Sequence, residues 1–185
     1  RHTRLQGDWS SDVCSSDLFR KEILMYYYDR HFNTIMVGPK GDDLTRGEDT
    51  EWCYLIQLQD YILWYSQELK FYHFMTATRM TWDYYLKLKK GISSGAAKME
   101  SYTLFFHEKS PSNIKFIIHY YRLYLYFSFV WIQFKWRSKL QPNRYTKEQH
   151  DLGKVVNHTR AMAFKNHFKV TFQHFKQLKT ILKEK

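Results

Sequence analysis

Cysteine, glycine and proline are scarce in this chain of 185 residues, which contains 2 Cys, 7 Gly and 3 Pro. Two cysteines exclude a disulfide scaffold and a four-cysteine zinc site. The shortage of glycine and proline excludes collagen-like and linker-like sequence. A mean hydropathy of -0.60 excludes a polytopic membrane protein. Aromatic residues, by contrast, form 19% of the chain, and this apolar content favours a folded domain with a substantial core.

The first eighteen residues contain an unusual run, DWSSDVCSSDL, at positions 8–18. This run resembles the conceptual translation of a short-read sequencing-library adapter, and residues 1–7 resemble the outer tail of the same adapter. The resemblance implies that residues 1–18 are not native protein. Like an expression scar, they then carry no information about the fold. It also implies that Cys14 carries no functional information. The native start, any targeting segment and the localisation are therefore not given by this sequence.

Residues 19–185 are expected to form a single domain whose two halves differ in charge. Residues 19–112 contain 12 basic and 12 acidic residues. Residues 113–185 contain 15 basic and 3 acidic residues, a net charge of +12. Because so few internal counter-charges are present, the second half should attract polyanions such as nucleic-acid phosphate or anionic lipid headgroups.

The spacing of apolar residues predicts three longer helices, at residues 50–75, 113–140 and 146–183. Residues 80–88 alternate between apolar and polar, which is typical of a strand, and residues 98–106 could pair with them as a hairpin across a Gly-Ser turn. The predicted fold is therefore mainly α, a helical bundle with a small β-hairpin, and the alternative is an α+β fold. Cys53 lies in an apolar context, WCYLI, and is predicted to be a core residue.

The apolar segment at residues 113–137 has two interpretations. A helix that is apolar around most of its circumference is either buried in a core or faces a membrane. The length is close to the roughly twenty residues that span a bilayer, and Trp131 and Trp136 lie beside basic residues as in an interfacial aromatic belt. Arg122, near the middle, opposes spanning. We favour a buried core helix over a membrane-spanning one.

Residues 146–183 carry the most regular pattern of the chain. Thr146 is followed three residues later by Gln149, which is the spacing of a capping box. An apolar stripe at helical spacing follows, made by Phe164, Phe168, Phe172, Phe175, Leu178 and Leu182. Lysines at positions 165, 169, 176 and 183 run beside this stripe. Such a regular stripe argues against a spurious reading frame.

No motif indicates catalysis or metal binding. The loop GPKG at residues 38–41 lacks the lysine that follows the second glycine of a phosphate-binding loop, and Asp42 and Asp43 would repel phosphate. His167 and His174 share a helix face, but two turns separate them by about 10.5 Å, too far for one zinc ion. We therefore predict no catalytic residue, no metal and no cofactor, lean against an enzyme, and identify no small-molecule substrate.

The favoured function is a non-enzymatic binding or accessory protein whose basic C-terminal face engages a polyanion, with nucleic acid or a ribonucleoprotein as the first candidate. Aromatic residues between the basic ones would suit base stacking. The predicted polyanion-binding residues are Arg137, Arg144, Lys165, Lys169, Lys176 and Lys183. The alternative is a membrane-associated subunit anchored by residues 113–137, with a basic helix lying on anionic lipid. Protein partners are compatible with either function.

Overall fold

The computed structural model describes residues 2–4, 20–36, 38, 46–64, 68, 72 and 75–183. Most of the adapter-like segment lies outside these residues. Most of the GPKG loop at residues 38–41, with Asp42 and Asp43, also lies outside them. So does much of the second half of the helix predicted at residues 50–75.

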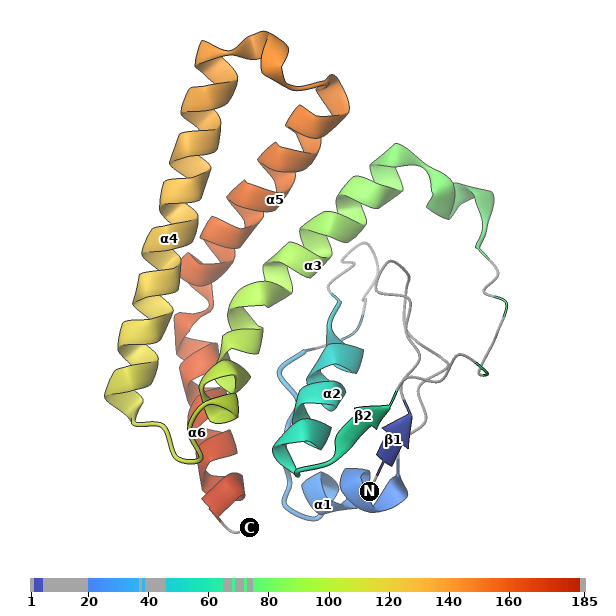
Figure 1. The fold of residues 1–185 in the computed structure, drawn as a ribbon, viewed down its shortest axis with the longest axis vertical. Helices are drawn as coiled ribbons and strands as arrows, with labels where there is room; N and C mark the ends of the chain where they lie inside the picture. The colour runs from blue at the N-terminus through green and yellow to red at the C-terminus, as the bar shows by residue number, and fades with distance from the viewer. Residues whose placement is uncertain are drawn as a thin grey trace.

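Six α-helices make up most of the described chain (Figure 1). They are α1 (Lys21–Tyr28), α2 (Glu48–Leu58), α3 (Trp82–Thr103), α4 (Asn113–Leu140), α5 (Lys147–Asn166) and α6 (Phe168–Lys183). Short 3-10 helices occur at η1 (Ala77–Met80), η2 (Leu104–Phe106) and η3 (Pro142–Arg144). Two three-residue strands, β1 (His2–Arg4) and β2 (Ile62–Trp64), pair in parallel. The prediction of a mainly α fold is confirmed.

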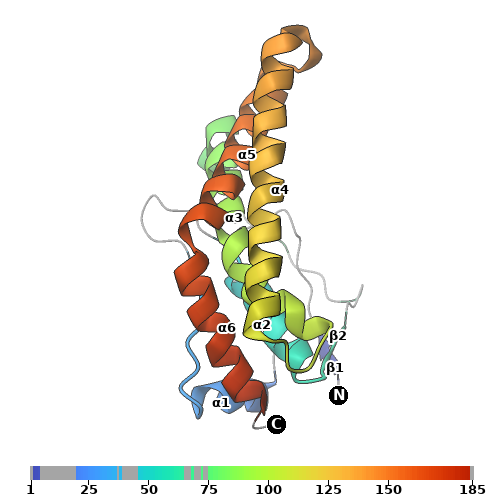
Figure 2. The same cartoon turned by 90° about the vertical axis from the view of Figure 1, so that its left-hand side faces the viewer.

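Helix α5 packs between α4 and α3, and α6 continues it toward the opposite end of the molecule (Figures 1 and 2). α4 and α5 run antiparallel and form a long hairpin that η3 closes. The small helices α1 and α2 pack near the lower part of α3 and the end of α6 in Figure 1. One anchor between these parts is the Tyr26 hydroxyl of α1, which donates to the Ile181 carbonyl of α6 at 3.3 Å.

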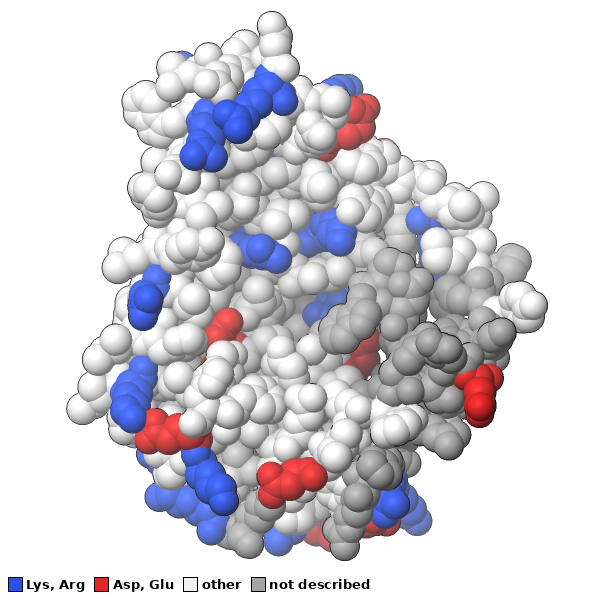
Figure 3. Space-filling view, in the orientation of Figure 1, with Lys and Arg blue, Asp and Glu red and all other residues white. Residues whose placement is uncertain are grey.

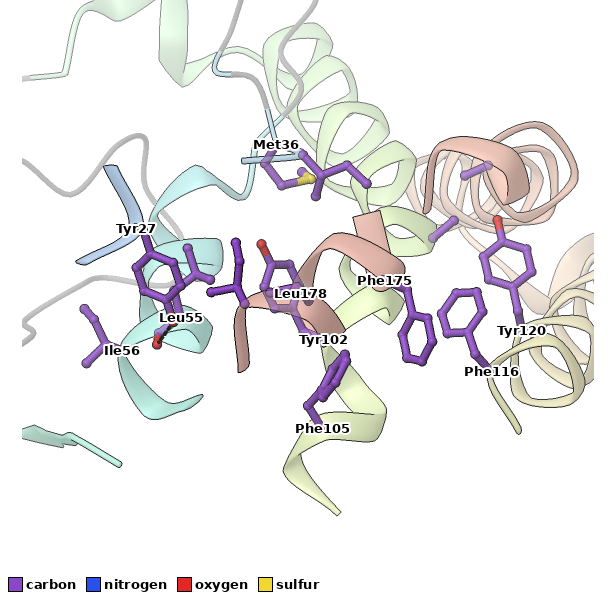
Figure 4. Packing of buried hydrophobic residues seen from close by; sticks show 14 of the residues in the cluster. Tyr27, Met36, Leu55, Ile56, Tyr102, Phe105, Phe116, Tyr120, Phe175 and Leu178 are labelled. Carbon is purple, nitrogen blue, oxygen red and sulfur yellow. Dashed lines mark hydrogen bonds between the residues drawn. The ribbon is translucent and has the colours of Figure 1, made fainter. Parts of the chain in front are cut away.

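The core is built largely from aromatic rings (Figure 4). Phe116 of α4 stacks on Phe175 of α6 with ring centroids 4.4 Å apart. Tyr120 of α4 is also buried, and its hydroxyl donates to the Phe164 carbonyl at 3.0 Å. Phe164 and Phe175 both belong to the apolar stripe predicted from the sequence, so this stripe is the surface that docks α5 and α6 onto the rest of the fold.

The helix predicted at residues 146–183 is two helices, α5 and α6, separated at His167. The capping box is confirmed, because the Gln149 amide donates to Thr146 Oγ1 at 3.2 Å and the Thr146 amide donates to Gln149 Oε1 at 3.1 Å. Gly153 lies one turn further on, where a Cβ would come within 2.5 Å of Phe134 Cε2. This glycine therefore allows α4 and α5 to approach closely near the end of the hairpin.

The predicted β-hairpin is wrong, because residues 80–88 and 98–106 fall largely within α3. The turn-like stretch between them lies inside the helix, where Gly91 and Gly95 are buried. A Cβ on Gly95 would lie 2.5 Å from Met36 Cε. These small residues let other segments approach the helix, and the gain from packing outweighs the low helix propensity of glycine, about 1 kcal/mol per residue.

The helix predicted at residues 50–75 is too long, because α2 ends at Leu58. Asp60 takes a positive φ of 61°, and the amide of Tyr61 donates back to the Ile56 carbonyl at 3.2 Å. Together with the bond from Asp60 to Gln57 at 2.9 Å, this is a Schellman ending, which turns the chain out of the helix and into β2. Cys53 of α2 is half-buried, whereas the sequence predicted a core position.

Candidate polyanion interface

Four of the predicted lysines lie exposed along the C-terminal helices. They form the lysine face, defined as Lys165 at the end of α5 with Lys169, Lys176 and Lys183 on α6. Three of the four lysines of α6, Lys169, Lys176 and Lys183, follow one another at seven-residue intervals, so they share one side of the helix at intervals of about 10.5 Å. The opposite side of α6 carries the buried Phe175, Leu178 and Ile181. Core packing thus fixes which side of α6 carries the lysines.

Aromatic rings lie directly beneath this face. Lys176 Nζ lies 5.0 Å from the centroid of the Phe172 ring, a cation–π contact. Phe172 in turn stacks on Phe168, with centroids 5.7 Å apart and planes at 9°, and on Phe116 of α4, at 5.7 Å and 21°. Lys176, which is exposed, therefore rests against a set of stacked rings.

The lysine face lies in a stretch of the sequence that contains no acidic residues. Residues 152–183 contain no Asp or Glu. Within the part of the chain that the structure describes, no carboxylate forms an ion pair with Lys165, Lys169, Lys176 or Lys183. Among the described residues, therefore, no ion pair neutralises these four ammonium groups.

The other two predicted residues, Arg137 and Arg144, lie in a separate group. They are exposed at the end of the α4–α5 hairpin, where Figure 3 shows Lys and Arg side chains gathered. α4 contacts α6 near its own start, where the rings of Tyr121 and Phe168 are 5.2 Å apart. Arg137 lies sixteen residues further along α4, about 24 Å away. The structure therefore divides the six predicted residues into the lysine face and a hairpin-end group.

Helix α4 is not the buried core helix that the sequence favoured. Only Phe116 and Tyr120 of α4 are buried. No helix in the described part of the chain combines the length and the apolar character needed to cross a bilayer. α4 lies at the surface of the molecule, and only its inner side packs against α5 and α6 (Figure 2).

The outward side of α4 is apolar along its whole length. Eight large residues spaced three or four apart form what we call the outer stripe: Ile114, Ile118, Tyr121, Leu125, Phe129, Ile132, Trp136 and Leu140. Each exposes between 48% and 71% of its surface. The sequence could not separate this stripe from the inner apolar side, because the helix is apolar around most of its circumference.

A buried polar cluster lies on the other side of the fold, centred on Glu51 of α2. The Glu51 carboxylate accepts hydrogen bonds from the backbone amides of Ile35 at 2.7 Å and Met36 at 2.8 Å. It also accepts a hydrogen bond from the Tyr102 hydroxyl of α3. Glu51 is fully buried, so these three donors replace the water that the carboxylate loses on folding.

His174 of α6 completes the cluster. Its Nε2 lies 3.3 Å from the Tyr102 hydroxyl and 3.6 Å from Glu51 Oε1. Its Nδ1 lies 2.9 Å from Ser101 Oγ, and Phe32 packs edge-on against the ring. The sequence pattern places His174 only on one helix face with His167, and no local signal connects it with Ser101 and Glu51, which lie 73 and 123 positions earlier in the chain.

Burial controls the protonation of this cluster. Loss of water raises the pKa of the Glu51 carboxyl, although its hydrogen bonds partly oppose the rise. Burial lowers the pKa of His174 to about 4, so its imidazole is neutral at pH 7. Burial and the adjacent carboxylate together raise the pKa of the Tyr102 hydroxyl.

These groups resemble catalytic machinery in type, yet their placement is structural. Glu51, Ser101 and Tyr102 have no exposed surface and His174 exposes 6%, so a substrate could not reach them in this conformation. The cluster instead ties α2, α3 and α6 together through hydrogen bonds. Among the described residues, no group of three or more His, Cys, Asp or Glu side chains is placed to hold a metal ion.

Comparison with known proteins yields no match for this chain among protein-family models, curated proteins or solved structures. Its function must therefore be argued from its own residues.

Proposed function

We propose that this chain is a non-enzymatic accessory protein that binds a phosphate-rich polyanion through the lysine face. The observation that supports the proposal most directly is that four exposed lysines, none in an ion pair with a described carboxylate, line a region without acidic residues. Nucleic acids and anionic lipid headgroups both offer closely spaced phosphates, so the lysine face by itself is suited to either. The hairpin-end group, with Arg137 and Arg144, would add a second contact to an extended polyanion.

The geometry supports several simultaneous phosphate contacts. Lys169, Lys176 and Lys183 span about 21 Å along α6, and a nucleic-acid strand of that length carries several phosphates. Each contact releases condensed counterions, and binding should therefore weaken linearly with the logarithm of salt concentration.

The test is fluorescence anisotropy of the full chain with a labelled 20-nucleotide single-stranded RNA at several salt concentrations. For single strands, log K falls with log salt at a slope of about -0.7 per contacted phosphate. The triple variant K169Q/K176Q/K183Q should thus bind more weakly, with a slope shallower by about 2.

A matched control removes the same charge from elsewhere. The variant K21Q/K87Q/K90Q replaces three exposed lysines on α1 and α3 and should leave the slope unchanged. Equal weakening of RNA binding by both triple variants, or absence of binding at low salt to both RNA and anionic lipid vesicles, would overturn the proposal. A double variant, R137Q/R144Q, measures how much the hairpin-end group contributes to the affinity for RNA.

A further inference from the structure

The outer stripe of α4 is larger than the apolar patches that monomeric proteins usually expose. Aromatic side chains have about 150–250 Å² of surface each; with Ile and Leu taken near the lower bound of that range, the eight residues at roughly half to two-thirds exposure leave on the order of 850 Å² uncovered. The largest apolar patch on a typical monomer is about 300–600 Å². An area of this size is comparable to one side of a standard interface, about 800 Å². The stripe therefore has the area of a docking surface.

Positive charge flanks this stripe. α4 contains five Lys and Arg residues and no Asp or Glu. Arg122 lies at one edge, one turn from both Ile118 and Leu125. At the other edge the Tyr121 ring contacts Phe168, and the next residue of α6 is the exposed Lys169, where the α6 part of the lysine face begins. Arg122 thus lies beside the apolar stripe, and Lys169 follows the α6 residue that contacts the other edge of the stripe.

We infer that α4 docks in the plane of an anionic lipid surface, with the outer stripe inserted at the level of the upper acyl chains and the flanking cations on the headgroups. This inference rests on the proposed function and names the source of the phosphate. An amphipathic helix lying on a membrane combines these two features, an apolar face that enters the interface by about 5–10 Å and basic residues that contact anionic headgroups. Tyr121 and Trp136 would occupy the interfacial zone that such rings prefer.

Nucleic acid fits the outer stripe less well than lipid does. Bases stack on aromatic rings, whereas the middle of the stripe is aliphatic, with Ile118, Leu125 and Ile132. A bound nucleic acid would leave these side chains in water, while acyl chains would cover them.

A second copy of the chain is also disfavoured. Two α4 helices packed stripe to stripe would bring the basic residues of one helix near those of the other, with no carboxylate on either helix and only Lys115 in a described ion pair, with Glu108. Like charges facing each other across an interface cost several kcal/mol. An anionic lipid surface offers the same apolar cover together with the opposite charge.

The test is sedimentation of the full chain with vesicles of phosphatidylcholine containing 30% phosphatidylserine, and with vesicles of phosphatidylcholine alone. We expect binding to the anionic vesicles. The variants I118Q and L125Q should each lower the partition coefficient by about tenfold, since burying one such side chain is worth at least about 1.5 kcal/mol. Both residues expose more than 60% of their surface, so the fold should tolerate the changes, which circular dichroism will check.

Matched controls separate insertion from general hydrophobicity and from charge. Tyr28 and Met80 each expose 74% of their surface outside α4, and the variants Y28Q and M80Q should bind vesicles normally. Binding of I118Q and L125Q to the labelled RNA should equal that of the unmodified chain. Quenching of tryptophan fluorescence by brominated lipid should fall in W136F but not in W82F, which removes the α3 tryptophan exposed to 40%.

Three outcomes would overturn the inference. Binding to RNA without binding to anionic vesicles would leave the polyanion function standing and reject the lipid surface. Vesicle binding that I118Q and L125Q leave unchanged would show contact through charge alone. A dimer in sedimentation velocity that L125Q converts to a monomer would assign the outer stripe to a second copy. Failure to bind either probe would instead reject the proposed function itself.

Discussion

The Tyr102 hydroxyl offers a direct test of the buried cluster. Tyr102 has no exposed surface, and its hydroxyl donates to Glu51 while lying 3.3 Å from His174 Nε2. The substitution Tyr102→Phe keeps the ring and removes this donor from a fully buried carboxylate. A hydrogen bond to a charged group contributes about 1.5–3 kcal/mol, so the free energy of unfolding should fall by about 2 kcal/mol. For a chain of this size the midpoint temperature should drop by roughly 4–8 °C.

Urea unfolding at pH 7, followed by circular dichroism, measures this change, and Tyr54→Phe provides the control. Tyr54 packs edge-on against Tyr102 with ring centroids 5.8 Å apart, but it is only half-buried, and no hydrogen bond joins its hydroxyl to another described residue. Its substitution should change the free energy of unfolding by less than about 0.5 kcal/mol.

A double-mutant cycle with Glu51→Gln assigns the loss to the pair. If the hydroxyl acts through Glu51, the two substitutions should show a coupling free energy of about 1–3 kcal/mol. Equal stability of Tyr102→Phe and Tyr54→Phe would refute the argument that the hydroxyl secures the carboxylate. A large loss without coupling would place the effect on His174 instead.

Two further predictions concern the capping of α5 and the dependence of stability on pH. Thr146→Ala removes the hydroxyl that accepts from the Gln149 amide and should lower the free energy of unfolding by about 1 kcal/mol in urea titrations, whereas Thr180→Ala, on the exposed side of α6, should change it little. Because burial lowers the pKa of His174 to about 4, from about 6.5 in the unfolded chain, the unfolded state alone binds this proton between those values. Stability should therefore fall as pH falls through that window, by up to about 3 kcal/mol from His174, while the raised pKa of Glu51 acts in the opposite direction. His174→Gln should remove the His174 contribution from a series of urea titrations at pH 7 to 4.5, and an unchanged pH profile in that variant would count against a neutral buried imidazole.

The helices that the sequence predicts best are those with local signals at both ends or a continuous stripe. The capping box at Thr146 fixes the start of α5, and the phenylalanine stripe fixes the side of α6 that faces the core. These are short-range properties, since they depend on residues three or four positions apart. The exposure of the lysine face follows from them, because a helix that buries one side must present the other to solvent.

The errors arise where distant residues decide the structure. The stretch containing Gly91 and Gly95 has turn composition, yet it is helical because other segments pack closely against its small residues. In the same way, only the backbone at Asp60 shows where α2 ends. Composition indicates which secondary structure each residue favours locally. Tertiary packing determines which secondary structure the segment adopts.

The sequence by itself determined that the chain is mainly helical, that its positive charge belongs to the C-terminal half, and that Lys169, Lys176 and Lys183 share one side of a helix. These features depend on composition and on helical periodicity, both of which are local. Only the tertiary structure separated Arg137 and Arg144 from those lysines, left the outer side of α4 uncovered, and enclosed Glu51 with Tyr102 and His174. Each of these depends on which surfaces meet across the fold. A helix that is apolar on every side does not specify which side its neighbours will cover.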